Sequence, residues 1–215
     1  MRPERRVGAL SFGKQGRGYA LLSERQHEGG DMPAVTSPEQ LFEHELQDMY
    51  YAEKTLTKVL PKLAEEASDR ELSRAFTSHL KQTEGHVANI EKVFRSIGKT
   101  PQATPCPGIE GIKKEHDEFV ESSSPSAEML DAFLTGAAAR AEHYEIAAYT
   151  GLVSQARALK EREAVELLQE NLKQEKDALK KVETISKRIL KEANGSTGNG
   201  SRVSSASGQR ARTRS

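Results

Sequence analysis

The sequence contains a single cysteine, Cys106, and no long hydrophobic run. One cysteine excludes a framework of internal disulfides and makes a reducing compartment the expected location. No segment approaches the roughly 18 consecutive apolar residues of a membrane span. The apolar stretch that follows Arg6 is too short for the core of a secretory signal. We therefore expect a cytoplasmic protein with no membrane segment.

The chain also lacks net charge, since 32 basic side chains balance 32 acidic ones. The balance is uneven along the chain: residues 1–31 carry +2, residues 194–215 carry +4, and residues 32–193 carry about −6. An acidic body suits a cation-binding core, whereas four arginines at the end can contact nucleic acid only weakly, through phosphates. The simpler alternative is that both tails only keep the protein soluble.

Composition divides the chain into three parts. Residues 1–36 are rich in Gly, Arg and Glu, residues 195–215 are rich in Ser, Gly and Arg, and neither part has a helical or strand period. Both are predicted to be disordered tails, and residues 37–194 are predicted to fold as one domain. Met32 directly precedes the first helical pattern and is a candidate for the true translation start. A transit peptide is the alternative, because the first 23 residues contain one acidic residue.

Start and stop signals predict four long helices. The first begins at a capping box of Ser37 and Gln40, with Pro38 at the first helical position. It extends to about Ala67, with a kink expected before Pro61 because the proline ring clashes with the preceding turn. A second helix is predicted from the capping box of Ser68 and Glu71 to Gly98. A short helix follows over about 109–121. The third long helix covers about 127–157, and the fourth covers about 161–193 and is ended by Asn194 and Gly195.

The connections between these helices define the expected fold class. The first and second helices are separated by only one or two residues, so they must be antiparallel neighbours, and the third and fourth helices form a second helical hairpin. The proline-rich residues 98–126 form a long connection between the hairpins. Two hairpins joined in this way are typical of an all-α, ferritin-like four-helix bundle.

Each long helix carries an apolar stripe that polar side chains interrupt near its middle. The interruptions are Glu53 in the first helix, His79, Thr83 and His86 in the second, Glu145 with Glu142 on its flank in the third, and Glu175 in the fourth. All lie within about a turn of the helix midpoints, so they should meet at one level of the core.

Burying several carboxylates together costs several kcal/mol for each one that stays charged and unpaired, roughly speaking. Divalent cations remove that cost. Carboxylates with imidazole favour Fe, Mn or Zn over Ca or Mg, and bridging glutamates can hold two ions. We therefore predict two divalent metal ions, Fe or Mn first and Zn as the alternative. Nearby Tyr50, Tyr144 and Tyr149 are candidates to hydrogen-bond the ligating carboxylates, although packing alone also explains them.

Residues 41–191 resemble the YciF-like family of ferritin-like bacterial stress proteins. The resemblance is carried by five segments, of which the fourth is the most specific: Asp48–Leu56, His79–His86, Cys106–Gly111, Ala141–Tyr149 and Glu175–Lys176. It implies a ferritin-like dimetal bundle of cytoplasmic, stress-linked character.

The chain departs from the Glu-x-x-His pattern of many dimetal bundles. Thr83 stands three residues before His86, and Ala178 stands three residues after Glu175. An amide at Gln82 and an apolar side chain at Leu179 replace expected acids. A single filled or weak metal site is therefore an alternative, and so is either histidine as the nitrogen ligand.

The sequence leaves two main functions open, with iron storage in a shell as a third possibility. The first is a redox-active dimetal site that handles peroxide, oxygen or ferrous iron, in a homo-oligomer for which a dimer is favoured. The second is a non-enzymatic helical bundle that acts through a partner or through weak nucleic-acid binding by its basic tail, with its core Glu and His side chains satisfying one another.

Overall fold

The structure is a computed structural model that describes the backbone of residues 34–200 and the side chains of residues 34–195. The expectations for the two tails, beyond these limits, lie outside the described residues. Within them the protein is all-helical, with no strand. Its helices in chain order are α1 Pro38–Glu66, α2 Arg70–Ser96, α3 Pro107–Ser123, α4 Ala127–Leu159 and α5 Arg162–Gly200.

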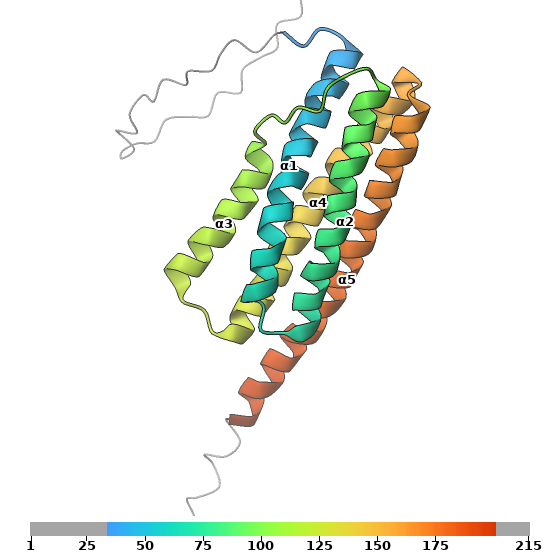
Figure 1. Ribbon diagram of the computed structural model, residues 1–215. Helices are drawn as coiled ribbons and strands as arrows, with labels where there is room; N and C mark the ends of the chain where they lie inside the picture. The colour runs from blue at the N-terminus through green and yellow to red at the C-terminus, as the bar shows by residue number, and fades with distance from the viewer. Residues whose placement is uncertain (1–33, 201–215) are drawn as a thin grey trace, which may run out of the picture. The chain divides into compact units, whose positions relative to one another are not determined.

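The four long helices form the predicted ferritin-like bundle (Figure 1). Helices α1 and α2 form one antiparallel hairpin, and α4 and α5 form the other. The hairpins pack through α1 against α4 and through α2 against α5. Helix α3 belongs to the long connection and lies outside the bundle, packed on α4. This arrangement turns one stripe of each long helix toward a shared axis.

Most of the predicted helix ends are confirmed. The Ser37–Gln40 capping box is formed, and Gly98 takes the left-handed conformation with a φ of 71° at the end of α2. Helix α1 contains Pro61 and continues to Glu66.

Two expected helix ends need correction. The N-cap of α2 is Asp69, whose side chain accepts from the backbone N–H of Leu72. Ser68 instead binds Asp131 at the start of α4, because its hydroxyl and its backbone N–H both donate to that carboxylate. At the same end of the bundle, α5 runs past residues 194 and 195 to Gly200 (Figure 1). Glycine permits a left-handed stop without requiring one, and neither residue adopts a positive φ.

The predicted stripes form the core. On α1, α2 and α4 most apolar positions of the predicted stripes are buried, including Leu46, Leu72 and Leu134, whereas Ala148 is half-buried. On α5 the stripe is displaced, because Leu172 and Leu179 are only half-buried and Asn171 is fully buried in their place. An amide can replace a leucine there because its hydrogen bonds are satisfied.

Polar contacts anchor α3 beside the bundle. Cys106, the N-cap of α3, places its Sγ 2.9 Å from the Tyr144 hydroxyl, which donates to Asp48 at 2.9 Å. Gly108 lies so close to the Tyr144 ring that a Cβ would stand 2.5 Å from it. Farther along α3, the rings of Phe119 and Phe133 stack with centroids 3.7 Å apart.

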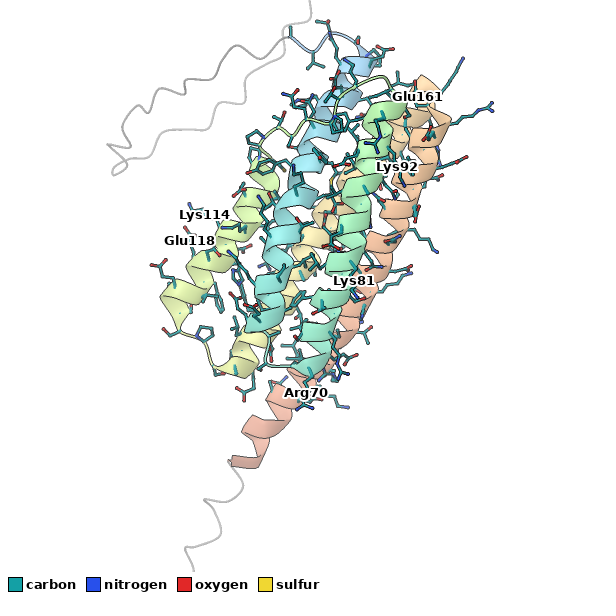
Figure 2. All side chains as sticks on the ribbon, in the orientation of Figure 1. Arg70, Lys81, Lys92, Lys114, Glu118 and Glu161 are labelled. Atoms are coloured by element: carbon teal, nitrogen blue, oxygen red, sulfur yellow. The ribbon has the colours of Figure 1, made fainter. Side chains whose placement is uncertain are left out.

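The outer surface is charged. Figure 2 shows side chains such as Lys114 and Glu118 on α3 and Lys81 on α2 pointing away from the bundle. Among the described residues, no helix combines the length and the apolar character that crossing a membrane requires.

Candidate metal centre

Six buried side chains that the sequence singled out lie together at mid-height of the bundle. They come from all four long helices: Glu53 from α1, His79 and His86 from α2, Glu142 and Glu145 from α4, and Glu175 from α5. Thr83, the remaining interruption of α2, is buried between the two histidines and donates to the carbonyl of His79 at 3.1 Å.

Possible ligand atoms form two groups, in each of which all atoms lie within 4.8 Å of one another. The first group consists of His79, Glu142, Glu145 and Glu175. The second consists of Glu53, His86 and Glu175. Each histidine therefore belongs to a different group, and Glu175 belongs to both.

The two oxygens of Glu175 face different histidines. Oε1 lies 2.7 Å from Nδ1 of His86, and Oε2 lies 3.5 Å from Nε2 of His79. The groups are completed by Oε1 of Glu142, 3.3 Å from His79, and by Oε1 of Glu53, 3.3 Å from His86. One carboxylate thus lies between two imidazole nitrogens, one from each group.

Several polar atoms of this cluster have no hydrogen-bond partner within the described part of the chain. They are both oxygens of Glu145, both oxygens of Glu175, Oε2 of Glu53, Oε2 of Glu142 and Nδ1 of His86. The short contact between His86 and Glu175 is thus an ion-pair contact and is not aligned as a hydrogen bond. Buried polar atoms are nearly always satisfied, so this concentration of free lone pairs fits a site built for cations. Carboxylate oxygens mixed with imidazole nitrogens suit iron or manganese.

Burial makes the carboxylates resist ionisation without a cation. It raises the pKa of Glu142 and of Glu145 well above the usual range, and the charge of Glu175 raises both further. Burial also raises the pKa of Glu53, although contact with His86 partly opposes this effect. Glu142 and Glu145 therefore favour their protonated forms until a positive ion enters.

Glu175 and His86 form the charged pair of the metal-free site. Burial opposes the ionisation of Glu175, but its contacts with His86 outweigh burial and lower its pKa. Burial likewise opposes the charging of His86, yet Glu175 and Glu53 together raise its pKa to about 10. The imidazolium therefore occupies a position between two carboxylates that a metal ion could take.

A buried network orients Glu53. The Tyr149 hydroxyl donates a short hydrogen bond to Oε1 of Glu53 and accepts from Nδ2 of Asn171 at 3.0 Å. Asn171 in turn accepts from Asn89 at 2.9 Å. Such contacts fix the orientation of a ligating carboxylate.

Amides also contact both histidines. Nε2 of His86 lies 3.1 Å from the Gln174 side-chain oxygen, and Nδ1 of His79 lies 3.3 Å from that of Gln82. In each ring the nitrogen that faces away from the carboxylates therefore has an amide partner. This leaves the other nitrogen to face the cluster.

The structure corrects the expectation for two of the three tyrosines. The Tyr50 hydroxyl donates to Glu91, and the Tyr144 hydroxyl donates to Asp48. Neither acceptor belongs to the cluster. Tyr149 alone of the three bonds a cluster carboxylate.

Sequence reasoning missed Asn171, Asn89 and Gln174. Asn171 precedes Glu175 by four residues and so shares its helix face, and Asn89 follows His86 by three. A search for polar residues one turn from each candidate ligand would have found both. Gln174 adjoins Glu175 in sequence and gives no periodic signal.

Comparisons with known proteins agree with this fold. The chain is 42% identical to Protein YciF of Escherichia coli (strain K12) over 139 residues, which are 64% of this chain and 83% of that protein. The crystal structure of the E. coli stress protein YciF superposes with a TM-score of 0.69 at 37% identity, covering 73% of this chain and 99% of that one.

A second solved structure, YcfI from Rhodopseudomonas palustris, is described as a putative structural protein. It gives a TM-score of 0.69 at 39% identity, covering 71% of this chain and 96% of that one. The sequence profile of the family described as Domain of unknown function (DUF892) matches residues 37–194. The chain therefore belongs to the DUF892 family, and it is a YciF-like protein with a ferritin-like helical fold.

Proposed function

We propose that this chain is a dimetal-carboxylate protein of the stress response, which handles peroxide, oxygen or ferrous iron in the cytoplasm with two ions of iron or manganese. The observation that carries the proposal is the division of Glu175, whose two oxygens face His79 on one side and His86 on the other. The stress assignment rests on the likeness to E. coli YciF, which is called a stress protein.

The distances between the candidate ligand atoms suggest which residues would hold each ion. His79, Glu142, Glu145 and Glu175 would hold one ion, and Glu53, His86 and Glu175 would hold the other. Two such ions, when bound, supply the electrons that reduce peroxide or oxygen. Glu175, which belongs to both groups, would help to hold each ion.

The protein itself contributes burial and orientation. Burial excludes water from Glu53 and Glu175, which are both 0% exposed. Tyr149 keeps its proton on the phenol oxygen, because burial raises its pKa well above the usual value, and it donates that proton in a hydrogen bond to Glu53. This hydrogen bond would hold Glu53 in the orientation in which it faces the metal site.

The direct test is metal content per chain in the purified full-length protein, together with anomalous scattering from its crystals. We expect two ions per chain, with both anomalous peaks next to Glu175. Ferrous iron should then be oxidised on addition of peroxide or oxygen, and Glu175→Gln should abolish this reaction. Exposed Glu121→Gln on α3 is the matched control and should behave as wild type.

The rival function is a non-enzymatic bundle whose core polar groups satisfy one another. It predicts no metal above background after incubation with Fe(II) or Mn(II) and no peak at the bundle centre. That result would reject the dimetal function.

A further inference from the structure

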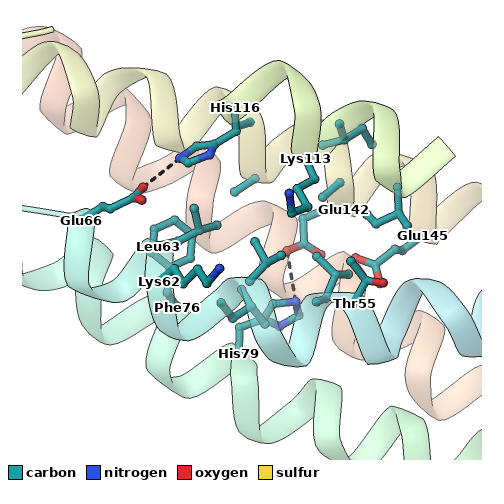
Figure 3. Close-up of a pocket in the computed structure, with 18 of the residues that line it drawn as sticks. Thr55, Lys62, Leu63, Glu66, Phe76, His79, Lys113, His116, Glu142 and Glu145 are labelled. Atoms are coloured by element: carbon teal, nitrogen blue, oxygen red, sulfur yellow. Dashed lines mark hydrogen bonds and ion pairs between the residues drawn. The ribbon is translucent and has the colours of Figure 1, made fainter. Parts of the chain in front are cut away.

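A cavity of about 120 Å³ leads from the surface to the first ligand group. It lies between α1, α3 and α4, and Figure 3 shows His79, Glu142 and Glu145 at its inner end. Exposed Lys62 and Glu66 on α1 and Asp117 on α3 also line it, so it reaches the surface.

The walls of the cavity are apolar. They include Leu56, Leu60, Leu63, Phe76, Ile109 and Ile112. Alanines of α4 complete the lining, and their small side chains do not narrow the cavity. A hydrated cation or a small anion gains nothing from such walls, whereas an apolar molecule gains about 25 cal/mol for each Å² it buries. An engineered apolar cavity of about 150 Å³ binds benzene. This cavity is smaller, at about 120 Å³, but it is open at the surface, so it limits the ligand to a single small ring.

The charges at the mouth are mostly paired with one another. Lys113 donates to Asp117 at 2.6 Å, and Nε2 of His116 lies 2.8 Å from Oε2 of Glu66. The mouth therefore offers little net charge to attract an anionic ligand.

The inner end, by contrast, offers acceptors. Glu142 and Glu145 line this end and are 5% and 1% exposed, so Glu142 presents the more accessible carboxyl group. A ligand with one O–H group can hydrogen-bond a carboxyl group at this end, whereas an ionised carboxylate ligand would lose its hydration between the apolar walls.

We propose that this cavity is the substrate pocket of the metal centre. The ligand that it takes is a small neutral molecule with an apolar body and one hydroxyl group, such as phenol. The inference deepens the proposed function, because it names the substrate class for the same site. The hydroxyl end lies against Glu142 and Glu145, and the apolar body lies against α1, α3 and Phe76.

Phenol is the probe, and the full-length, metal-free protein is the sample. Ligand-observed NMR and calorimetry should show saturable binding of phenol and much weaker binding of benzoate. Ala141→Leu narrows the cavity beside Glu145 and should weaken phenol binding about tenfold or more, a change of about 1.4 kcal/mol. Ala147→Leu, the same change at an exposed position of α4, should leave binding unchanged.

A second filling variant, Ala137→Leu, guards against misfolding of the first, and circular dichroism melts show whether each folds. Equal phenol binding by wild type and a folded filling variant would overturn the proposal. Benzoate binding more tightly than phenol would also overturn it, since the mouth lysines would then select the ligand.

Loading with paramagnetic Mn(II) locates the pocket relative to the metal. Bound phenol should lose its ring-proton signals in Mn(II)-loaded wild type and keep them in Ala141→Leu with the same Mn(II). Wild type that binds Mn(II) but no phenol overturns the pocket alone. Wild type that binds phenol but no Mn(II) overturns the proposed function and, with it, the assignment of phenol as a substrate.

Discussion

Nδ1 of His86 lies 2.7 Å from Oε1 of Glu175. Glu145, in the same cluster, has neither oxygen hydrogen-bonded by any described residue. The buried carboxylates are therefore unequal in the metal-free protein: Glu175 has a positive partner, and Glu145 has none. Loss of Glu145 should therefore stabilise the metal-free protein, whereas loss of Glu175 should destabilise it by leaving the charge of His86 short of a partner.

Glu145→Met should stabilise the metal-free protein at pH 7. Methionine has a similar length and no polar atoms that need partners. Removing the unsatisfied group should raise the free energy of unfolding by about 1 to 3 kcal/mol. Denaturant melts with a chelator present measure it, and Glu121→Met on the exposed face of α3 is the control. A loss of stability would show that Glu145 has a structural partner.

The same variant has a pH signature. The folded-state pKa of Glu145 lies above its unfolded value because of burial. Wild type therefore loses stability as pH rises from about 4, the unfolded carboxyl pKa, through the folded pKa. The advantage of Glu145→Met should accordingly be small near pH 4 and grow toward neutral pH.

The bundle was predictable because its stripes are regular. Spacings of three and four residues located the core of α1, α2 and α4, and Ser37 and Gly98 located two helix ends. The start of α2 was not predictable, because Ser68 and Asp69 are both good caps by type. Asp131, 62 residues away, decides between them by taking the backbone N–H of Asp69 and the hydroxyl of Ser68.

The candidate site was predictable as a set, since each residue interrupts an apolar stripe near mid-height. Its internal pairing was not. Whether Glu175 faces His79, His86 or both depends on the rotation of α5 about its axis, and buried Asn171 shows that the stripe of α5 is displaced from its leucines. Periodicity alone does not show whether a single polar residue in an apolar stripe is buried or exposed.

Metal stoichiometry should depend on which group a variant alters. Glu53→Gln touches only the group of His86, so we expect about one Mn(II) per chain. Glu175→Gln touches both groups and should remove both ions. At about 100 times the dissociation constant, each independent site should stabilise wild type by about 2.7 kcal/mol. Elemental analysis and melts with Mn(II) measure these effects, and equal stoichiometry in both variants would contradict the shared role of Glu175.

Tyr149→Phe tests the network that orients Glu53. The phenol both donates to Glu53 and accepts from Asn171 at 3.0 Å, so its loss leaves two buried groups short of a partner. We expect a loss of about 1 to 3 kcal/mol in the metal-free protein. Tyr51→Phe removes a hydrogen bond to Glu110 at the surface of the bundle and should cost less than about 1 kcal/mol. Equal costs for both variants would mean that the network contributes nothing beyond an ordinary hydrogen bond.

Metal uptake should release protons, and affinity should therefore rise with pH. In the metal-free protein His86 holds a proton, because Glu175 and Glu53 outweigh burial and raise its pKa to about 10. Burial keeps protons on Glu142 and Glu145 as well, by raising the pKa of each well above its usual range. A metal ligand must be deprotonated, so each ion that binds displaces protons from its group.

Calorimetric titrations of Mn(II) in two buffers with different ionisation enthalpies count the protons released. We expect more than one per chain at pH 7, and apparent affinity that increases with pH below about 10. Binding with no proton release and no dependence on pH would place the ion at a surface site, away from His86 and these glutamates.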